Sequence, residues 1–305
     1  MKIKRRTLKY MFVLILILLL VYLVSQYLKK DQYTFKDSRF SYSENKGKPS
    51  YEILLRSSNE TFDMYSVNFK SRDFMDYETK IYGRLFMPKG KDNVPGLVLL
   101  PGGGVTKESE ITLAGFIASL GYAVLTIDQR GLGETGGIYL GLEQDYAVFK
   151  EGKEPINHLS VFDGLRAYDV LKEIKGVDKN NIAIAGESMG GRYAVIAAAI
   201  DKRLKGVIAI SSSGFHVKDD SSNPYNSYLL SIDIDNYISS ISPNPVIMIH
   251  GTNDTTVPLE SARFTFNLAK EPKKFFIAEG CGHGYCDAMK KDLENSLNEI
   301  FWNKK

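Results

Sequence analysis

Residues 182–191 read Ile-Ala-Ile-Ala-Gly-Glu-Ser-Met-Gly-Gly, and this stretch decides the fold. An apolar strand, Ile182–Ala185, leads into the pattern G-x-S-x-G, and an Ala-rich helical segment, Gly190–Ile200, follows it. The serine of such a motif occupies a tight strand-to-helix turn with strained dihedral angles, where neighbouring Cβ atoms would collide with backbone. The pattern also arises by chance, so the flanking elements and the partners decide its meaning. The context predicts Ser188 as an exposed nucleophile near a helix N-terminus.

The chain around this stretch alternates between apolar runs of strand length and segments of helical spacing. Continuous apolar runs separated by helices are typical of strands buried on both faces of a parallel sheet. Two earlier segments of alternating character, Asp63–Ser71 and Thr79–Met87, predict an antiparallel hairpin at a sheet edge. Ser160, three residues before Asp163, indicates a helix start. The other predicted strands are Gly96–Leu100, Tyr122–Ile127, Gly206–Ile210, Val246–Ile249 and Lys274–Ala278.

These patterns predict the α/β class, with a three-layer α/β sandwich around a mostly parallel sheet. We expect this catalytic domain to occupy residues 51–305. Within it, residues 213–244 follow a strand at the usual position of a lid and contain several apolar and aromatic side chains. An apolar lid over an acyl pocket and a short helix that only covers the sheet are both open interpretations of this segment.

A glycine triplet follows the strand Gly96–Leu100. Pro101 is followed by Gly102, Gly103 and Gly104, at the place where this architecture supplies one donor of an oxyanion hole. We expect the N–H groups of Gly103 and Met189 to be the two donors, because three glycines let a carbonyl group approach the backbone. A phosphate-binding loop is the alternative, but neither G-x-x-x-x-G-K-[ST] nor G-x-G-x-x-G occurs here.

The base can be sought by elimination because the chain has four histidines. His158 and His216 fall in regions that do not normally face the nucleophile, and His250 closes a strand where we expect it to shape a turn. His283 remains, in the glycine-rich loop 280–284 after the last strand. Loops at the carboxyl ends of parallel strands are where α/β sheets gather their sites.

Asp254 is the expected acid of the site. It follows the preceding strand by a few residues, and its carboxylate can accept the Nδ1–H of an imidazole so that Nε2 takes the serine proton. The chain order Ser188, Asp254, His283 is the one typical of this kind of fold. We therefore predict these three residues as a catalytic triad.

Five motifs in chain order resemble the α/β-hydrolase superfamily, with its prolyl-oligopeptidase and dienelactone-hydrolase-like branch as the nearest likeness. The resemblance covers roughly residues 60–303 and implies an acyl-enzyme mechanism on an ester, thioester or peptide, with no metal and no cofactor. Pro101 departs from the family, because many members have His before the glycines. The motifs are Leu100–Gly104, Asp128–Gly131, Gly186–Gly191, His250–Asp254 with Val257-Pro258, and Gly282–Gly284.

The resemblance implies a serine esterase of the carboxylesterase kind. A serine peptidase of prolyl-oligopeptidase-like type is the alternative, but the short stretch between the N-terminal helix and the domain has no room for the propeller of those enzymes. Ser188 in place of cysteine argues against dienelactone hydrolysis. A non-catalytic hydrolase fold that binds a ligand is disfavoured, because no member of the triad is missing. Substrate identity and oligomeric state stay open.

Charge is distributed unevenly along the chain. The formal net charge is +3, yet residues 1–30 hold seven Lys or Arg and no acidic residue. The remainder carries 32 basic and 36 acidic side chains, a net charge of −4. This mildly acidic body has no dense basic stripe, so the composition gives no support for a nucleic-acid partner.

An apolar segment near the N-terminus predicts a membrane helix. Tyr10–Val24 is uninterrupted, and the charge-free span of residues 10–28 is 19 residues long. At about 1.5 Å per residue this span reaches roughly 28 Å, close to the ~30 Å hydrocarbon thickness of a bilayer. We therefore expect residues 1–30 to form a basic cytoplasmic start and one transmembrane signal-anchor, with residues 10–28 contacting the membrane.

The fate and orientation of this segment have alternatives. Basic residues are more numerous before it than after it, so the positive-inside tendency places the catalytic domain on the extracytoplasmic side. A cleaved export signal that yields a secreted enzyme is the competing interpretation, although no small-x-small site follows Val24. Residues 31–50 are polar and without periodicity, which predicts a tether.

Two cysteines, Cys281 and Cys286, flank His283. In an exported domain they could form a disulfide that stiffens the histidine loop. Two free thiols are an equal alternative, and a metal site with His283 lacks enough ligands.

Overall fold

The structure is a computed structural model that describes residues 5–30, 33–44, 46–75, 77–218 and 223–302. Within the first helix, side chains are described for residues 9–24. Lys2 and Lys4 of the expected basic start, and residues 219–222 of the expected lid segment, lie outside the described residues.

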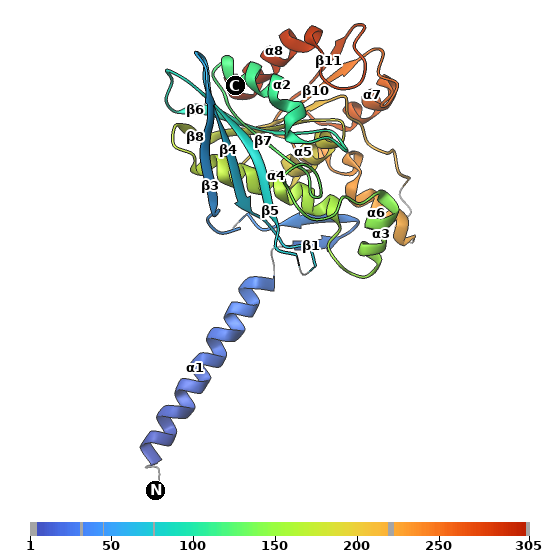
Figure 1. The fold of residues 1–305 in the computed structure, drawn as a ribbon. Helices are drawn as coiled ribbons and strands as arrows, with labels where there is room; N and C mark the ends of the chain where they lie inside the picture. The colour runs from blue at the N-terminus through green and yellow to red at the C-terminus, as the bar shows by residue number, and fades with distance from the viewer. Residues whose placement is uncertain (1–4, 31–32, 45, 76, 219–222, 303–305) are drawn as a thin grey trace.

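A nine-stranded sheet forms the centre of the molecule, in the order β11-β10-β9-β8-β6-β7-β5-β4-β3 (Figure 1). The pairs from β7 through β6, β8, β9 and β10 to β11 are all parallel, whereas β5, β4 and β3 add antiparallel strands at one edge. The predicted mostly parallel sheet with an antiparallel hairpin is therefore confirmed. The strands are β3 (Tyr51–Ser58), β4 (Phe62–Lys70), β5 (Lys80–Pro88), β6 (Val94–Leu100), β7 (Ala123–Ile127), β8 (Val177–Glu187), β9 (Val207–Ile210), β10 (Val246–Gly251) and β11 (Lys273–Ala278).

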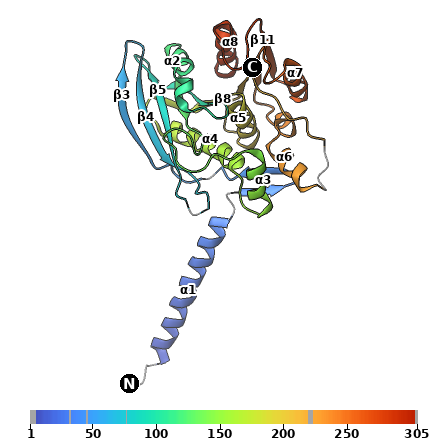
Figure 2. The same ribbon diagram turned by 45° about the vertical axis from the view of Figure 1, so that its right-hand side comes forward.

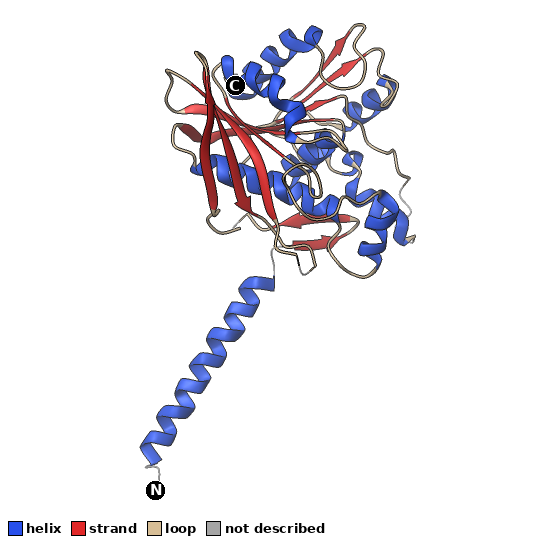
Figure 3. Cartoon of the chain, viewed as in Figure 1, coloured by secondary structure: helices blue, strands red, loops and turns tan. Residues whose placement is uncertain are grey.

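Helices cover both faces of the sheet, and each face has its own hydrophobic core (Figures 2 and 3). Alternate residues of a strand belong to different cores: Val98 lies in the core of one face of the sheet and Leu97 in the core of the other. This three-layer arrangement follows from strands whose residues are buried on both faces. The helices are α2 (Ile111–Ser119), α3 (Leu142–Lys150), α4 (Ile156–Glu173), α5 (Met189–Ile200), α6 (Pro224–Ile232), α7 (Leu259–Leu268) and α8 (Lys290–Phe301).

Helix α4 begins at Ile156, so the helix start expected at Ser160 is wrong. The carboxylate of Asp145, on α3, accepts the N–H groups of Ile156 at 2.5 Å and Asn157 at 3.1 Å. A distant side chain thus caps the helix one turn earlier than the local pattern indicates. The Ser160 hydroxyl instead donates to the Ile156 carbonyl inside the first turn.

Residues 33–42 form a two-stranded hairpin, β1 (Tyr33–Lys36) and β2 (Arg39–Tyr42), where a polar tether was expected. Phe40 is 2% exposed, and its ring lies 3.9 Å from the ring of His158, centroid to centroid. The aromatic residues of this segment alternate along short strands, so one face is buried against α4 and the segment that contains α6. This part of the chain belongs to the folded domain.

Helix α1 (Arg5–Lys30) stands clear of the domain in both ribbon views (Figures 1 and 2). None of the helices in the described part of the chain combines the length and the apolar character needed to cross a membrane. The transmembrane helix expected over residues 10–28 thus gains no support from the fold, and the side chains of residues 25–28 lie outside the description.

The segment expected as a lid contains α6 and two single 3-10 turns, η2 (Ile234–Asn236) and η3 (Ile238–Ser240). Tyr228 on α6 is fully buried, and its hydroxyl donates to Asp145 at 2.9 Å. These contacts bind α6 to α3.

Candidate active site

Ser188 lies on the turn between β8 and α5, where the chain reverses from strand to helix. Its φ of 51° and ψ of −115° are strained for a residue with a side chain, and its N–H donates to the Ile210 carbonyl at 2.8 Å. The residue is half-buried and stands at the N-cap of α5. The hydroxyl therefore lies at the positive end of a helix, on the carboxyl edge of the sheet.

The glycines around Ser188 allow this turn to pack. A Cβ on Gly186 would collide with the backbone of Gly190, and a Cβ on Gly190 would collide with the carbonyl of Leu100. The strained turn therefore depends on glycine at both positions.

His283 and Asp254 lie together on the loops after β11 and β10. The His283 Nδ1 atom is 2.9 Å from Oδ2 and 3.0 Å from Oδ1 of Asp254. The carboxylate side chain is fully buried, whereas the imidazole is 28% exposed. With Nδ1–H donating to Asp254, Nε2 is left as the proton acceptor.

The surroundings of Asp254 keep it ionised. Burial alone would raise the pKa of Asp254, but the Val257 N–H at 2.8 Å and the neighbouring His283 hold the pKa below its ordinary value. His250 is buried beside them, and its Nε2–H donates to the Val257 carbonyl at 2.8 Å. Burial lowers the pKa of His250, and the bond to Val257 ties the ring to the turn, as expected from its place in the sequence.

The glycine loop after β6 lies beside the nucleophile. A Cβ placed on Gly102 would stand 3.7 Å from the Ser188 Cβ, and Gly103 is exposed next to the Met189 side chain. Gln129, which follows β7, donates its amide hydrogens to the carbonyls of Pro101 at 2.9 Å and Gly102 at 2.8 Å. Gln129 thus fixes the loop that carries Gly103. This contact could not be predicted from the motif Asp128–Gly131 in which Gln129 lies.

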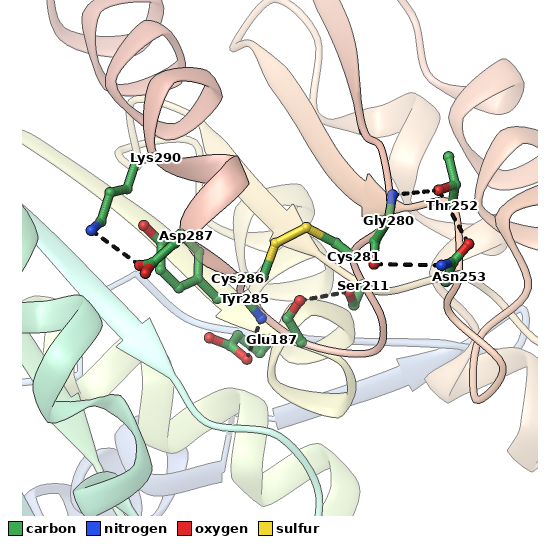
Figure 4. The surroundings of a disulfide bond; sticks show 11 residues. Glu187, Ser211, Thr252, Asn253, Gly280, Cys281, Tyr285, Cys286, Asp287 and Lys290 are labelled. Carbon is green, nitrogen blue, oxygen red and sulfur yellow. Dashed lines mark hydrogen bonds and ion pairs between the residues drawn. A yellow bond between two sulfur atoms is a disulfide. The ribbon is translucent and has the colours of Figure 1, made fainter.

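The histidine loop is joined to the nucleophile turn through Glu187, which sequence reasoning also missed. Its Oε2 atom accepts the Tyr285 N–H at 3.2 Å, and the Ser211 hydroxyl donates to the Gly284 carbonyl at 3.3 Å (Figure 4). Among the described contacts, the Ser188 hydroxyl makes no hydrogen bond to the His283 ring. The two loops are held side by side through these neighbours.

Cys281 and Cys286 form a disulfide that closes the histidine loop (Figure 4). The Asn253 N–H donates to the Cys281 carbonyl at 2.9 Å, which ties the loop to the turn of Asp254. Among the residues that the structure describes, no three His, Cys, Asp or Glu side chains gather as metal ligands would.

A small pocket of about 140 Å³ opens beside the nucleophile turn. Its lining combines apolar and polar side chains, so a ligand there meets hydrogen-bonding groups as well as hydrocarbon. Among its lining residues are Gln129, Tyr139, Leu140, Asn157, Met189 and Tyr193.

The remaining histidines lie apart from this pair. His158 is buried within α4, hydrogen-bonded to Tyr33 at 3.0 Å and Ser231 at 2.7 Å, and burial lowers its pKa to about 3. His216 lies 2.6 Å from Asp235. Neither is joined by a described contact to the nucleophile turn.

Comparison with known proteins identifies a family. Residues 11–215 match the model of the acetyl xylan esterase family, AXE1. The uncharacterized protein YfhR of Escherichia coli O157:H7 is 30% identical over 139 residues, which cover 44% of this chain and 49% of YfhR. Acetyl esterase Axe7A of Xylanibacter ruminicola is 23% identical over 274 residues, covering 81% of this chain and 60% of that protein. The chain spans about half the length of the first curated relatives that it matches.

Solved structures share the fold. The acetyl xylan esterase from Paenibacillus sp. R4 superposes with a TM-score of 0.69 at 21% identity, covering 85% of this chain and 91% of that one. Acetyl xylan esterase 1 from Thermoanaerobacterium sp. JW/SL YS485 gives a TM-score of 0.63 at 17% identity, covering 83% and 89%. At these identities the likeness shows the fold alone.

The resemblance to the α/β-hydrolase superfamily is thereby confirmed. The family model covers more than half of the chain, from residue 11 to residue 215. The chain belongs to the acetyl xylan esterase (AXE1) family.

Proposed function

We propose that the protein hydrolyses short-chain acyl esters, acetyl esters first among them, with Ser188, His283 and Asp254 as its catalytic triad. The observation that carries this proposal is the buried, ionised Asp254 paired with a partly exposed His283, on loops tied to the turn of Ser188. Membership of an acetyl xylan esterase family supports the reaction class.

In the proposed first half-reaction, His283 Nε2 removes the hydroxyl proton as the Ser188 Oγ attacks the ester carbonyl carbon. Asp254 accepts the Nδ1–H and stabilises the imidazolium. The N–H groups of Gly103 and Met189 bind the resulting oxyanion; removing one such donor typically costs about 10²–10³ in rate. The imidazolium then protonates the leaving alcohol as the C–O bond breaks.

In the second half-reaction, water attacks the acyl-enzyme. His283 accepts a proton from this water and returns it to Ser188 as the new tetrahedral intermediate collapses. The carboxylic acid leaves and the free enzyme is restored.

The pocket beside Met189 supports a small acyl group. At about 140 Å³ it has room for a short chain, and Tyr139 offers a polar group to the rest of the substrate. The side chains of Asn157 and Tyr193 are hydrogen-bonded to each other, and Asn157 also donates to Asp145. Acetyl xylan appears in the names of the family and of relatives, which makes an acetylated sugar the natural substrate class to test once esterase activity on model esters is established.

A panel of p-nitrophenyl esters with acetyl, butyryl and octanoyl groups, together with an alanyl p-nitroanilide, tests the reaction class. We expect kcat/KM for acetate to exceed that for octanoate at least tenfold, with no cleavage of the anilide. Ser188→Ala is the matched control. Faster cleavage of the anilide than of any ester would replace the esterase proposal with a peptidase.

We also propose that α1 tethers the domain to a membrane, with the domain on the extracytoplasmic side. All fifteen side chains of Tyr10–Val24 are apolar and between 48% and 72% exposed, an unusual surface for a helix in water. The run is shorter than the about 20 residues that a spanning helix needs, so the flanking basic residues would have to lie among the headgroups. A disulfide beside His283 supports an oxidising compartment.

Extraction of membranes from cells that express the full chain tests this tether. We expect the protein to stay with membranes in alkaline carbonate and the domain to be digested by protease added to spheroplasts. A chain lacking residues 1–30 should appear in the soluble fraction. Recovery of the full chain in the carbonate supernatant would contradict the tether.

A further inference from the structure

Two carboxyl groups lie against each other beside the candidate nucleophile. Glu187 directly precedes Ser188 at the end of β8, and Glu110 ends the 3-10 turn η1 (Lys107–Glu110) that leads into α2. Glu110 is 2% exposed, and its carboxyl group is within hydrogen-bonding reach of Glu187. Glu187 is half-buried, and a buried carboxyl group in contact with a second carboxyl group cannot ionise beside it without a large cost.

The carboxylate of Glu187 contacts the backbone of the histidine loop. Its Oε2 atom accepts the Tyr285 N–H at 3.2 Å, two residues beyond His283 (Figure 4). A Cβ on Gly284 would stand only 3.1 Å from the same oxygen, so glycine lets the loop close on this carboxylate. The α2 side chains Ile111 and Phe116 pack into the same hydrophobic core as Tyr285.

Glu110 has one satisfied oxygen and one that lacks a partner. The Ser109 hydroxyl donates to its Oε1 atom at 2.9 Å, whereas Oε2 is buried with no hydrogen-bond partner among the described residues. A proton on Oε2 would supply the missing bond by donation to Glu187. Burial, and then the charge of Glu187, raise the pKa of Glu110 to about 8, and burial raises the pKa of Glu187 also.

Other charges near the pair do not neutralise it. His283 interacts electrostatically with Glu187, and Tyr285 interacts electrostatically with Glu187, Asp287 and Glu294. Lys290 pairs with Asp287 at 3.0 Å. In the described part of the chain neither Glu110 nor Glu187 forms an ion pair with Lys or Arg, so a shared proton is what relieves the repulsion.

We propose that Glu110 and Glu187 share one proton and act as a positioning pair that holds the His283 loop against the nucleophile turn. While the proton is present, the pair presents a single carboxylate to the Tyr285 N–H. Loss of the proton leaves the buried charge of Glu110 against the half-buried charge of Glu187, which drives the carboxylates apart and loosens the loop. The effect on hydrolysis rests on the function proposed above, whereas the effect on the loop does not.

The direction with pH follows from the raised pKa of Glu110. The folded protein holds a proton that the unfolded chain gives up near pH 4.5, so the pair's contribution is fully present below that pH and declines as pH rises toward about 8. A catalytic histidine that must be neutral gives activity rising with pH. A fall in activity above pH 8 is therefore the signature of the pair.

Glu110→Gln tests the proposal, because an amide donates to Glu187 at every pH. Glu108→Gln is the matched control, since it removes the same charge from the same turn at an exposed position. Hydrogen exchange of the Tyr285 amide at pH 7 and pH 9, corrected for the intrinsic rate, measures the loop without substrate. The pH profile of kcat/KM on p-nitrophenyl acetate measures the consequence.

We expect protection of the Tyr285 amide in wild type and in Glu108→Gln to fall at least tenfold from pH 7 to pH 9, and kcat/KM to fall at least threefold. In Glu110→Gln both should stay within twofold. Equal loss of protection in Glu110→Gln and wild type would overturn the proposal, as would full protection of wild type at pH 9. If the wild-type protein is inactive on every ester, the proposed hydrolase function is wrong. The hydrogen-exchange data would still show whether Glu110 and Glu187 hold the loop through a shared proton.

Discussion

Asp254 is the single side chain on which the proposed chemistry depends most closely after the nucleophile. It accepts bonds from His283 and from the backbone of Thr256 and Val257. The backbone bonds hold the carboxylate whether or not the ring is present. Replacement of Asp254 by asparagine, which has the same shape, should therefore change the orientation of the His283 ring more than the backbone turn at residues 254–257.

We predict that Asp254→Asn lowers kcat for p-nitrophenyl acetate by about 10⁴, because the amide favours the wrong imidazole tautomer. Steady-state kinetics at pH 7.5 measures the loss, and Asp287→Asn, at an exposed position just after the histidine loop, should stay within twofold. A loss of less than tenfold in Asp254→Asn would assign the acid to another residue.

Gln129 offers a second prediction at this scale. Its amide bonds to Pro101 and Gly102 hold the loop of Gly103, so Gln129→Ala should lower kcat by about 10- to 100-fold, less than loss of an oxyanion donor itself. KM should change less than threefold, since the side chain acts on the backbone donor. An unchanged kcat would show that the loop is held without this amide.

At the residue scale the sequence predicted the pairing of His283 with Asp254 and the turn of Ser188. The G-x-S-x-G motif predicts the turn of Ser188, and the order of the two strand-end loops predicts the pairing of Asp254 with His283. Glu187 and Gln129 were missed because their roles depend on where a side chain reaches across the sheet edge. Glu110 is far from the motif in sequence and meets Glu187 only in the fold.

At the scale of elements, the N-terminal hairpin β1–β2 is the main departure from expectation. Phe40 packs on His158, and its N–H donates to the Tyr237 hydroxyl at 3.0 Å. The strands are only four residues each, too short for periodicity to distinguish them from a polar tether. The long, fully apolar strands were recognisable because burial on both faces leaves continuous runs.

We predict that Phe40→Ala lowers the free energy of unfolding by about 3–5 kcal/mol, the usual cost of removing a buried phenylalanine. Urea unfolding followed by fluorescence measures it. Thr34→Ala, on the exposed side of the same hairpin, should stay within about 0.5 kcal/mol. Equal stabilities of the two variants would restore the tether interpretation.

The start of helix α4 is a second feature that the sequence did not predict correctly. Its start depends on Asp145, a residue of the preceding helix that caps Ile156 and Asn157. Helix starts set by a local Ser or Asp can be read from sequence, whereas a cap supplied by tertiary contact cannot.

At the scale of the whole molecule, α1 is separate from the packed body. The hydrophobic cores of the described chain contain no residue of Tyr10–Val24. Removing residues 1–30 should therefore leave the melting temperature within about 2 °C and kcat/KM within twofold, since the side chains that are described for this helix, those of residues 9–24, belong to none of the hydrophobic cores. Calorimetry of both chains in detergent decides this. A drop above 5 °C would show that the helix packs on the domain.

The overall architecture was the most predictable feature. The mostly parallel sheet follows from alternating strands and helices, the antiparallel edge from two segments of alternating character, and the expected place of the site from the carboxyl ends of the strands. The order of the strands in the sheet was not predicted. The nature of the substrate depends on the pocket beside Met189, whose walls come from four separate segments. The shape of this pocket therefore could not be predicted from the sequence.

The central claim is that Ser188 becomes acylated because His283 activates it. Intact-protein mass spectrometry after treatment with a fluorophosphonate tests this most directly. We predict one adduct on the wild-type chain, located by peptide mapping at Ser188, none on Ser188→Ala, and labelling at least 100-fold slower on His283→Ala. Labelling of Ser188→Ala at the wild-type rate, or equal rates for His283→Ala and wild type, would contradict the account.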